Sequence, residues 1–179
     1  MDGPLVDRPL GTRPEPVDPT WFRRVLGHYP TGVCVVTAVD ADGTAVGLAV
    51  GSFTSVSLNP PLILFCPDKN STSWPRIEQV GRFCVNILAH DQRDVCHRFA
   101  SKAADKFEGL GHRLSPRGNP ILDDVVAWID CSVHAVLGAG DHSIVLGRVL
   151  ELSTLRVEQP LVFLKGGYGQ FLPLRDATF

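Results

Sequence analysis

The residues with the most unusual spacing are the small ones of the segment GLAVGSFTSVS, residues 47–57. Gly47, Ala49 and Gly51 alternate, so on an extended strand they share one face that carries almost no side-chain atoms. Such a face lets a flat ligand approach the backbone closely and leaves N–H groups available as hydrogen-bond donors. The same spacing also suits a position where two elements of a barrel cross tightly, and the pattern leaves both interpretations open.

A second candidate is an anion site in the segment KNSTS, residues 69–73, directly before a predicted helix. Free N–H groups at a helix N-terminus and flanking hydroxyls bind anions readily, although capping of the helix by Ser73 explains the same residues. Arg98, Lys102 and Lys106 follow at a spacing of four residues. They would form one basic stripe if a single helix ran through all three, and such a stripe is usually a solvated face.

A third candidate is His142, in the glycine-rich turn GAGDHS at 138–143, just before a predicted strand. A turn histidine can donate a hydrogen bond to a ligand or titrate near pH 6.5, although loops tolerate polar residues of any kind. The turn begins like the dinucleotide motif GxGxxG, but a strand follows where that motif requires a helix. The sequence contains no P-loop GxxxxGK[ST] and no GxSxG nucleophile elbow.

The composition excludes several classes of protein. Lys plus Arg number 17 and Asp plus Glu number 19, for a formal net charge of −2, which argues against nucleic acid or an anionic membrane as the main partner. No apolar run reaches the ~18 residues of a membrane helix, and the N-terminus does not resemble a secretory signal. An odd number of cysteines without a CxxC pair predicts reduced thiols in a cytoplasmic protein and no metal site. These cysteines are Cys34, Cys66, Cys84, Cys96 and Cys131.

The elements that must position these candidates are mostly strands. Residues 1–17 contain four prolines and no hydrophobic period, which predicts a flexible proline-rich N-terminal arm and a single domain over 18–179. Within that domain, runs of apolar and β-branched residues separated by turn signals predict a barrel or sandwich. The predicted strands are 32–40, 44–53, 54–58, 62–66, 82–88, 125–133, 143–152 and 161–164.

Three short helices are predicted around these strands. Asp18-Pro19 is typical of an N-cap and first helical turn. The apolar face of that helix consists of Trp21, Phe22, Val25 and Leu26. A second helix is predicted over 73–80 with Ser73 as its N-cap, and a third over 91–100 with Asp91 as its N-cap.

The order of motifs along the chain resembles the short-chain flavin reductases, the small enzymes that supply reduced flavin to two-component monooxygenases. The resemblance covers about residues 20–170, and its specific part is the pairing of SxSLxPPL with a later GDH. The motifs are PTGVCVVTA (30–38), SFTSVSLNPPLILFC (52–66), STSW (71–74), GRFCVNIL (81–88), RFA and DKFEG (98–109) and GDHSIVLGRV (140–149).

The resemblance implies a mainly β fold, a Greek-key-like split β-barrel of the FMN-binding type with a few short helices, and a homodimer. His142 matches a histidine associated with NADH or NADPH in the family, and Tyr168 is a candidate wall of the same nicotinamide pocket. Because Ala49 and Gly51 are small where family members often carry a polar residue, we expect backbone groups to supply most contacts to the ring. The residues that the resemblance assigns to FMN or FAD are Ala49, Val50, Gly51, Ser52, Ser57, Cys66, Pro67, Asp68, Thr72, Ser73, Arg98, Phe99 and Lys106.

The function implied by the resemblance is reduction of FMN or FAD by hydride transfer from NADH or NADPH, with delivery of reduced flavin to a partner oxygenase. The cofactor carries this chemistry, so we expect no acid–base residue, nucleophile or metal. Backbone donors near 49–52 would stabilise the negative charge that grows on the ring. One alternative is a non-catalytic flavin-binding split-barrel protein, a sensor or store that retains flavin without oxidising NADH. Another is a different split-barrel enzyme, such as an oxidase of a phosphorylated pyridine or a haem-handling protein.

Overall fold

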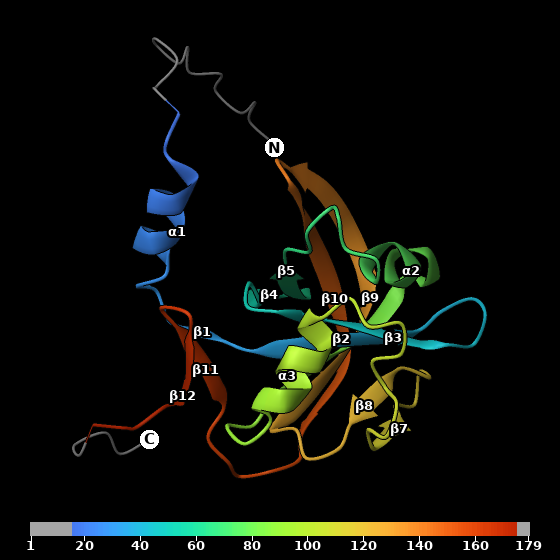
Figure 1. Ribbon diagram of the computed structural model, residues 1–179. Helices are drawn as coiled ribbons and strands as arrows, with labels where there is room; N and C mark the ends of the chain where they lie inside the picture. Colours follow the sequence, from blue (N-terminus) through green and yellow to red (C-terminus); the bar gives the residue numbers. More distant parts are fainter. Residues whose placement is uncertain (1–15, 175–179) are drawn as a thin grey trace.

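A seven-stranded antiparallel sheet curls into an open barrel in the computed structural model, which describes residues 16–174 (Figure 1). The strand order is β3-β2-β6-β9-β10-β5-β4, so β3 and β4 are the two edges of this sheet. The strands are β2 (Cys34–Val39), β3 (Ala45–Val50), β4 (Thr54–Leu58), β5 (Pro61–Phe65), β6 (Arg82–Ile87), β9 (Ala127–Ala139) and β10 (His142–Thr154). A small hairpin of β7 (His112–Leu114) and β8 (Pro120–Leu122) packs beside them.

Two clusters of buried side chains hold the barrel together. The inner cluster centres on Phe65, whose ring meets those of Trp74 and Phe83 edge-on, with centroids 5.5 and 5.2 Å apart. Gly147 of β10 is required there, because a Cβ at that position would lie 2.6 Å from Phe83 Cζ. The outer cluster packs the last of the three helices against the sheet through Cys96 and other apolar residues.

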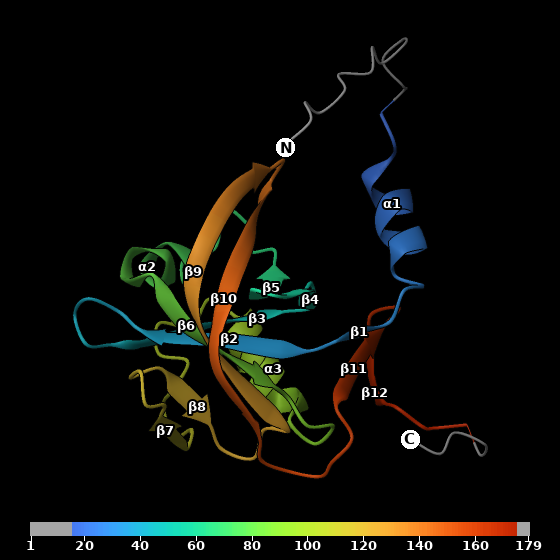
Figure 2. The same cartoon turned by 180° about the vertical axis from the view of Figure 1, so that it is seen from behind.

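The longest strands, β9 and β10, form a curved hairpin that extends beyond the barrel (Figure 2). Its tip is tied to the loop after β5 by an isolated β-bridge between Asp68 and His142 and by two backbone hydrogen bonds. These bonds run from Lys69 N to Asp141 O and from Ser143 N to Pro67 O, each 3.0 Å long. The hairpin therefore fixes His142 next to the turn that follows β5.

The N-terminal helix α1 (Pro19–Leu26) stands apart from the barrel beside a three-stranded sheet (Figures 1 and 2). That sheet contains β1 (Thr31–Gly32), β11 (Leu161–Leu164) and β12 (Gly167–Gln170) in this order. Asp18 caps α1 as predicted, accepting a hydrogen bond from the Trp21 N–H at 2.7 Å. No residue of α1 is buried, so its apolar face has no partner within the described chain.

Of the other two predicted helix caps, Ser73 has the predicted N-cap position but forms no capping hydrogen bond, and Asp91 is wrong. Ser73 precedes α2 (Trp74–Val80), but its hydroxyl does not cap the helix; the Trp74 N–H donates to Ser71 Oγ at 3.2 Å instead. The third helix, α3 (Arg93–Ala100), begins after Gln92. Asp91 accepts a hydrogen bond from Arg156 at 3.1 Å and plays no part in capping.

The basic stripe is also absent. Because α3 ends at Ala100, Lys102 and Lys106 lie in the following loop and do not continue a face that begins at Arg98. The Arg98 guanidinium donates a hydrogen bond to the Glu108 carbonyl.

The mainly β prediction with a few short helices is confirmed, and each predicted strand is present. Strands 54–58 (β4) and 161–164 (β11) have the predicted ends, and the ends of the others are shifted. Strands β7, β8 and β12 were not predicted. Most of the predicted flexible arm, residues 1–15, lies outside the described residues. Among residues 16–174, no helix is both long and apolar enough to cross a membrane.

One ion pair anchors α2 to the barrel. The Asp40 carboxylate at the end of β2 accepts hydrogen bonds from the Thr44 N–H and from Arg76 Nε, both at 2.9 Å. The Thr44 N–H and the Arg76 guanidinium lower the pKa of Asp40. The same loop contains the predicted turn, where Gly43 has a φ of +80°.

Candidate functional site

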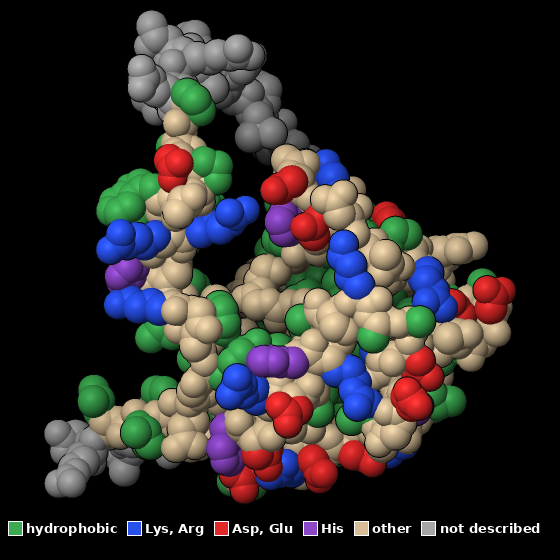
Figure 3. All heavy atoms as spheres, in the orientation of Figure 1, with side chains coloured by type: hydrophobic (Ala, Val, Ile, Leu, Met, Phe, Trp, Pro, Cys, Tyr) green, Lys and Arg blue, Asp and Glu red, His purple; other side chains and the backbone are tan. Residues whose placement is uncertain are grey.

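An open cleft of about 1180 Å³ runs along the free edge of β3, between α1 and the body of the barrel. Figure 3 shows the hollow that separates α1 from the rest of the molecule. Phe22 and Leu26 of α1 form one wall, while the loop after β5 and the C-terminal end of α3 form others. His142, at the tip of the β9–β10 hairpin, also lines the cleft.

The edge of β3 offers the cleft unpaired backbone groups. β3 pairs only with β2, in the antiparallel register Thr37 with Gly47 and Val35 with Ala49. The Gly47 carbonyl accepts a hydrogen bond from Lys106 and so points away from β2. Because backbone groups alternate in direction along a strand, the N–H and C=O of Ala49 point to the same free edge. A ring with donors and acceptors on its rim can bind there.

The turn after β3 is fixed by a side chain. Ser52 Oγ accepts a hydrogen bond from the Cys66 N–H at 2.8 Å, which ties the end of β3 to the end of β5. Cys66 continues into Pro67 and Asp68, which also line the cleft. Asp68 Oδ1 accepts a hydrogen bond from the Asn70 N–H at 2.7 Å, so this wall is ordered by its own polar contacts.

At the mouth of the cleft, His142 is paired with its neighbour in sequence. His142 Nδ1 lies 2.8 Å from Asp141 Oδ1. The hydrogen bond from His142, together with its charge when protonated, lowers the pKa of Asp141. This pairing orients the ring and leaves Nε2 as the nitrogen available to a ligand.

Lys106 supplies an ammonium group without a counter-ion. Its Nζ donates to Phe99 O at 3.0 Å, to Gly47 O at 3.2 Å and to Ser73 Oγ at 3.3 Å. No carboxylate of residues 16–174 forms an ion pair with it. Partial burial lowers its pKa, which is the effect of removing a cation from water without compensation. An anion bound beside Lys106 would supply that compensation.

A smaller cavity of about 380 Å³ adjoins the cleft. Thr72, Lys102 and Lys106 line both spaces, and Arg76 and Ser73 line only the smaller one. Two ammonium groups and the Thr72 hydroxyl thus lie where the two spaces adjoin, whereas the charge of Arg76 is already paired with Asp40. This end of the cleft is suited to a phosphate group.

Comparison with known proteins identifies the fold and the family. A family model described as "Flavin reductase like domain" matches residues 26–172. This chain belongs to that family. The prediction of an oxidoreductase is confirmed, and so is the resemblance to the short-chain flavin reductases.

Curated relatives agree over most of their length. A flavin reductase of Pseudomonas putida is 62% identical over 155 residues, which cover 87% of this chain and 91% of the relative. The reductase subunit HsaB of a flavin-dependent monooxygenase from Rhodococcus jostii is 51% identical over 86% of this chain and 78% of its own.

Solved structures share the same architecture. Nitrilotriacetate monooxygenase component B from Mycobacterium thermoresistibile superposes with a TM-score of 0.85 at 48% identity, covering 89% of this chain and 90% of that one. The NADH:FAD oxidoreductase SgcE6 of Streptomyces globisporus, in complex with NAD and FAD fragments, gives a TM-score of 0.83 at 34% identity, covering 91% and 100%. The split-barrel prediction is therefore confirmed.

The structure brings into one cleft most of the residues that were predicted to bind flavin. One of the two residues predicted to bind the nicotinamide lies in this cleft too. The residues that line it are Ala49, Val50, Gly51, Ser52, Cys66, Pro67, Asp68, Thr72, Phe99, Lys106 and His142. Ser73 lines the adjoining cavity. Ser57, in β4, and Arg98 do not line the cleft. Tyr168 lines a separate recess and is not part of a common wall with His142.

Of the two interpretations left open for the side-chain-poor face of β3, the structure excludes an open ligand-binding face. A Cβ on Gly47 would lie 2.7 Å from Phe99 Cε1 and 3.0 Å from Val36 O, because α3 packs directly on that face. Ala49 packs against the same outer cluster. The tight-crossing interpretation is therefore correct for the face of the strand, and what the cleft contacts is its edge.

Several cleft residues were missed as site candidates. Phe22 and Leu26 belong to the predicted apolar face of α1 and lie one turn apart, which was the available signal. Asn70, Ser71 and Lys102 also line the cleft but were not missed, since the first two belong to the candidate anion segment and Lys102 to the candidate basic stripe. The remaining missed residues are Leu48, Ala100 and Ser101.

The cysteines are all free, and four of the five are buried. Burial raises the pKa of Cys34 and of Cys131 to about 12 and that of Cys84 further still, so these thiols stay protonated. Cys66 is the partly exposed one and lines the cleft. Within residues 16–174, no group of three or more His, Cys, Asp or Glu side chains is arranged to hold a metal ion.

Proposed function

We propose that this chain reduces FMN or FAD at the expense of NADH or NADPH and supplies the reduced flavin to a partner flavin-dependent oxygenase. The observation that carries the proposal is one cleft that joins an unpaired strand edge, an uncompensated ammonium group and a histidine at its mouth. Relatives named as reductase subunits of monooxygenases support the oxygenase partner.

Bound flavin supplies the hydride acceptor and the reduced nicotinamide supplies the hydride. The residues around them bind and orient. The free edge at Ala49, with the turn fixed by Ser52 and Cys66, presents preformed backbone groups to the rim of a ring. Donors held in place before the reaction stabilise developing negative charge without reorganisation, and loss of one such donor typically costs about 3 kcal/mol in the barrier.

The basic end of the cleft suits the phosphate of either flavin. Lys106 and Lys102 supply charge, and the Thr72 hydroxyl supplies a further donor. A bound phosphate would compensate for the hydration that Lys106 loses on burial. The ammonium is already held in place by three oxygens, so little side-chain entropy is lost when the phosphate binds. Ser73 already accepts from Lys106 and helps to hold the ammonium in position.

His142 would bind the nicotinamide nucleotide. Its ring is oriented by Asp141, and its position at the cleft mouth leaves it accessible to a second ligand after flavin is bound. Hydride transfer removes no proton from the substrate, so His142 acts in binding and not as a base.

The test is to mix the purified protein with FMN or FAD and with NADH or NADPH and to follow the nicotinamide absorbance band. We expect rapid loss of that band with at least one pair. The non-catalytic alternative, a sensor or store, predicts flavin retained in stoichiometric amount and no nicotinamide oxidation. Unchanged absorbance with all four pairs would overturn the proposal of a reductase.

A homodimer is part of the proposal. The α1 side chains Trp21, Phe22 and Leu26 are 57, 53 and 55% exposed, and the β9–β10 hairpin exposes Leu137 and Leu152 by 52 and 63%. Apolar surface on this scale is typical of an interface between subunits. A second copy packed on these exposed residues would cover both and leave the flavin cleft, which Phe22 and Leu26 also line, at the edge of the interface. Light scattering coupled to gel filtration should give twice the chain mass of 19.5 kDa, and a monomer at micromolar concentration would contradict it.

The five free thiols also favour the cytoplasm as the location, because oxidising compartments select for paired cysteines.

A further inference from the structure

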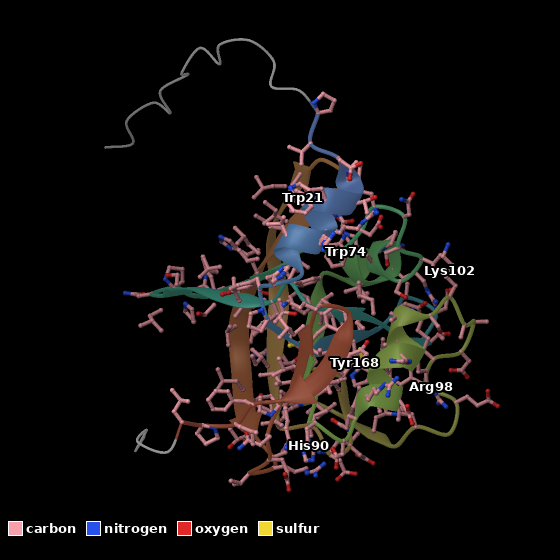
Figure 4. The ribbon with its side chains drawn as sticks, turned by 60° about the vertical axis from the view of Figure 1, so that its left-hand side comes forward. Trp21, Trp74, His90, Arg98, Lys102 and Tyr168 are labelled. Atoms are coloured by element: carbon pink, nitrogen blue, oxygen red, sulfur yellow. The ribbon has the colours of Figure 1, made fainter. Side chains whose placement is uncertain are left out.

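A recess of about 620 Å³ lies between α3 and the β11–β12 hairpin, and none of the residues that line it also lines the flavin cleft. Figure 4 shows Tyr168 of β12 beside α3, with His90 further along the same side of the molecule. The flavin reductase proposal gives this recess no role. Its side chains nevertheless have a distinct chemistry.

Basic side chains gather on one wall, and Arg93 is the permanent cation among them. His90, Arg93 and His97 line the recess, and no Asp or Glu lines it. Arg93 Nε donates to His97 Nε2 at 3.4 Å, and the guanidinium lies 5.7 Å from the centroid of the Tyr168 ring. Arg93 forms no ion pair with any residue of the described chain. Its planar pair of terminal nitrogens is therefore available to an anion.

The wall formed by β11 and β12 is aromatic and stays uncharged, and it adjoins the basic side chains. The Tyr168 ring packs against His97 and Phe163, each at a centroid distance of 5.2 Å. The Tyr168 hydroxyl lies 3.4 Å from Cys96 Sγ, which fixes the ring, and burial raises the pKa of Tyr168 to about 12. The tyrosine thus remains neutral, and no phenolate competes with an incoming anion.

The floor of the recess is flat and apolar. Leu161 is 1% exposed, and a Cβ on Gly169 would meet nothing within 4 Å, so the strand leaves room for a ring above it. One carboxylate near the basic wall is Glu158, whose Oε2 lies 3.8 Å from His90 Nδ1. Glu158 Oε1 also lies 3.9 Å from Arg156, so its carboxylate is partly paired with a cation, and neither residue lines the recess. His90 Nδ1 has no hydrogen-bond partner.

We propose that this recess binds a small aromatic carboxylate, with its ring against Phe163 and Tyr168 and its carboxylate on Arg93. An inorganic anion would use the guanidinium but not the aromatic wall. A neutral aromatic would fill the wall but leave the guanidinium without a partner. Only a ligand with a planar apolar body and a planar anionic group satisfies both, because guanidinium and carboxylate pair through two parallel hydrogen bonds.

The test is calorimetric titration of the flavin-free, full-length protein with benzoate, benzyl alcohol and inorganic phosphate. We expect benzoate to bind at least about tenfold more tightly than either of the other two, since each of them lacks one half of the recognition. Saturating FMN should leave the benzoate affinity unchanged. The measurement requires no turnover, so it stands whether or not the chain reduces flavin.

Two variants locate the binding site. Arg93→Gln should raise the benzoate Kd at least about tenfold, whereas Arg117→Gln, an equal loss of charge in the turn between β7 and β8, should not change it. Both side chains are exposed, so both variants should fold, which circular dichroism checks. No benzoate binding, equal binding by Arg93→Gln, or displacement of benzoate by FMN would each overturn the proposal.

Discussion

Replacing Lys106 by Met should separate recognition of the flavin phosphate from recognition of the ring. Methionine keeps an unbranched apolar stem of similar length but removes the ammonium group. That ammonium is held by three neutral oxygens, of Gly47, Ser73 and Phe99, at 3.0 to 3.3 Å, and by no carboxylate. Its charge is therefore available in full to a bound phosphate.

The size of the effect follows from the type of bond lost. A hydrogen bond to a charged group contributes about 1.5–3 kcal/mol, which corresponds to roughly a 10- to 150-fold rise in Kd at about 1.4 kcal/mol for each factor of ten. Lys102 lines the same region but is exposed and forms no hydrogen bond within the described chain. A solvated charge of this kind contributes about 0–1 kcal/mol, so Lys102→Met should raise Kd by about fivefold at most.

The assay is fluorescence titration of both variants with FMN and with riboflavin, which has the same ring and no phosphate. Lys106→Met should weaken FMN as stated and change riboflavin by no more than about twofold. The pH dependence gives a second readout. Burial sets the pKa of Lys106 below its ordinary 10.5, so the preference of the unmodified protein for FMN over riboflavin should fall as pH rises through that lowered pKa. In Lys106→Met the preference should not respond to pH in this range.

Equal loss of FMN and riboflavin affinity in Lys106→Met would refute the reasoning. It would mean that Lys106 acts only by holding Gly47, Ser73 and Phe99 together, and that the phosphate lies elsewhere. Unchanged FMN affinity would refute it as well.

Three further predictions concern other parts of the molecule. His142→Ala should raise KM for the nicotinamide more than KM for flavin in steady-state assays, and equal changes would contradict its assignment. Gly47→Ala places a Cβ 2.7 Å from the Phe99 ring and should cost about 1–3 kcal/mol, seen as a lower Tm, whereas Gly32→Ala, with nothing within 4 Å, should leave Tm unchanged. Asp40, whose folded-state pKa is lowered, stabilises the fold above about pH 4 and loses this effect as pH falls through that pKa. Urea titrations should therefore show a steeper acid loss of unfolding free energy in the unmodified protein than in Asp40→Asn.

The strands were predictable because their signal is local. Alternating or β-branched runs such as 34–39 and 82–87 fix both the element and its buried side chains. β7 and β8 were missed because three residues are too few for a period, and β12 because two of its four residues are glycine, whereas the equally short β11 is apolar throughout. Each of the three pairs in a short local hairpin, β7 with β8 and β12 with β11, so pairing supplies the order that such short segments lack on their own.

The two predicted caps whose side chains do not cap a helix, Ser73 and Asp91, have a common physical cause. A serine or aspartate before a helix can cap it, but the same oxygen can also serve a distant partner. Ser73 accepts from Lys106 and Asp91 from Arg156, partners 33 and 65 residues away. The choice between local and distant partners depends on how the barrel brings loops together. Sequence reasoning therefore found the right polar residues and assigned them the wrong bonds.

The small residues of β3 show how a sequence pattern can describe one feature of a strand while the binding site uses another. Side chains project from the faces of a strand, whereas N–H and C=O groups project from its edges. The spacing of Gly47 and Ala49 describes the face of the strand. Helix α3 covers that face, because the Phe99 ring occupies the space that a Cβ on residue 47 would take. The edge is open for a different reason, that β3 is the last strand of its sheet. The two facts are linked, since α3 packed on the face carries the loop that brings Lys106 to Gly47 O at the edge. A bulkier residue at 47 would therefore displace the helix, and with it the cation that the cleft offers to a phosphate.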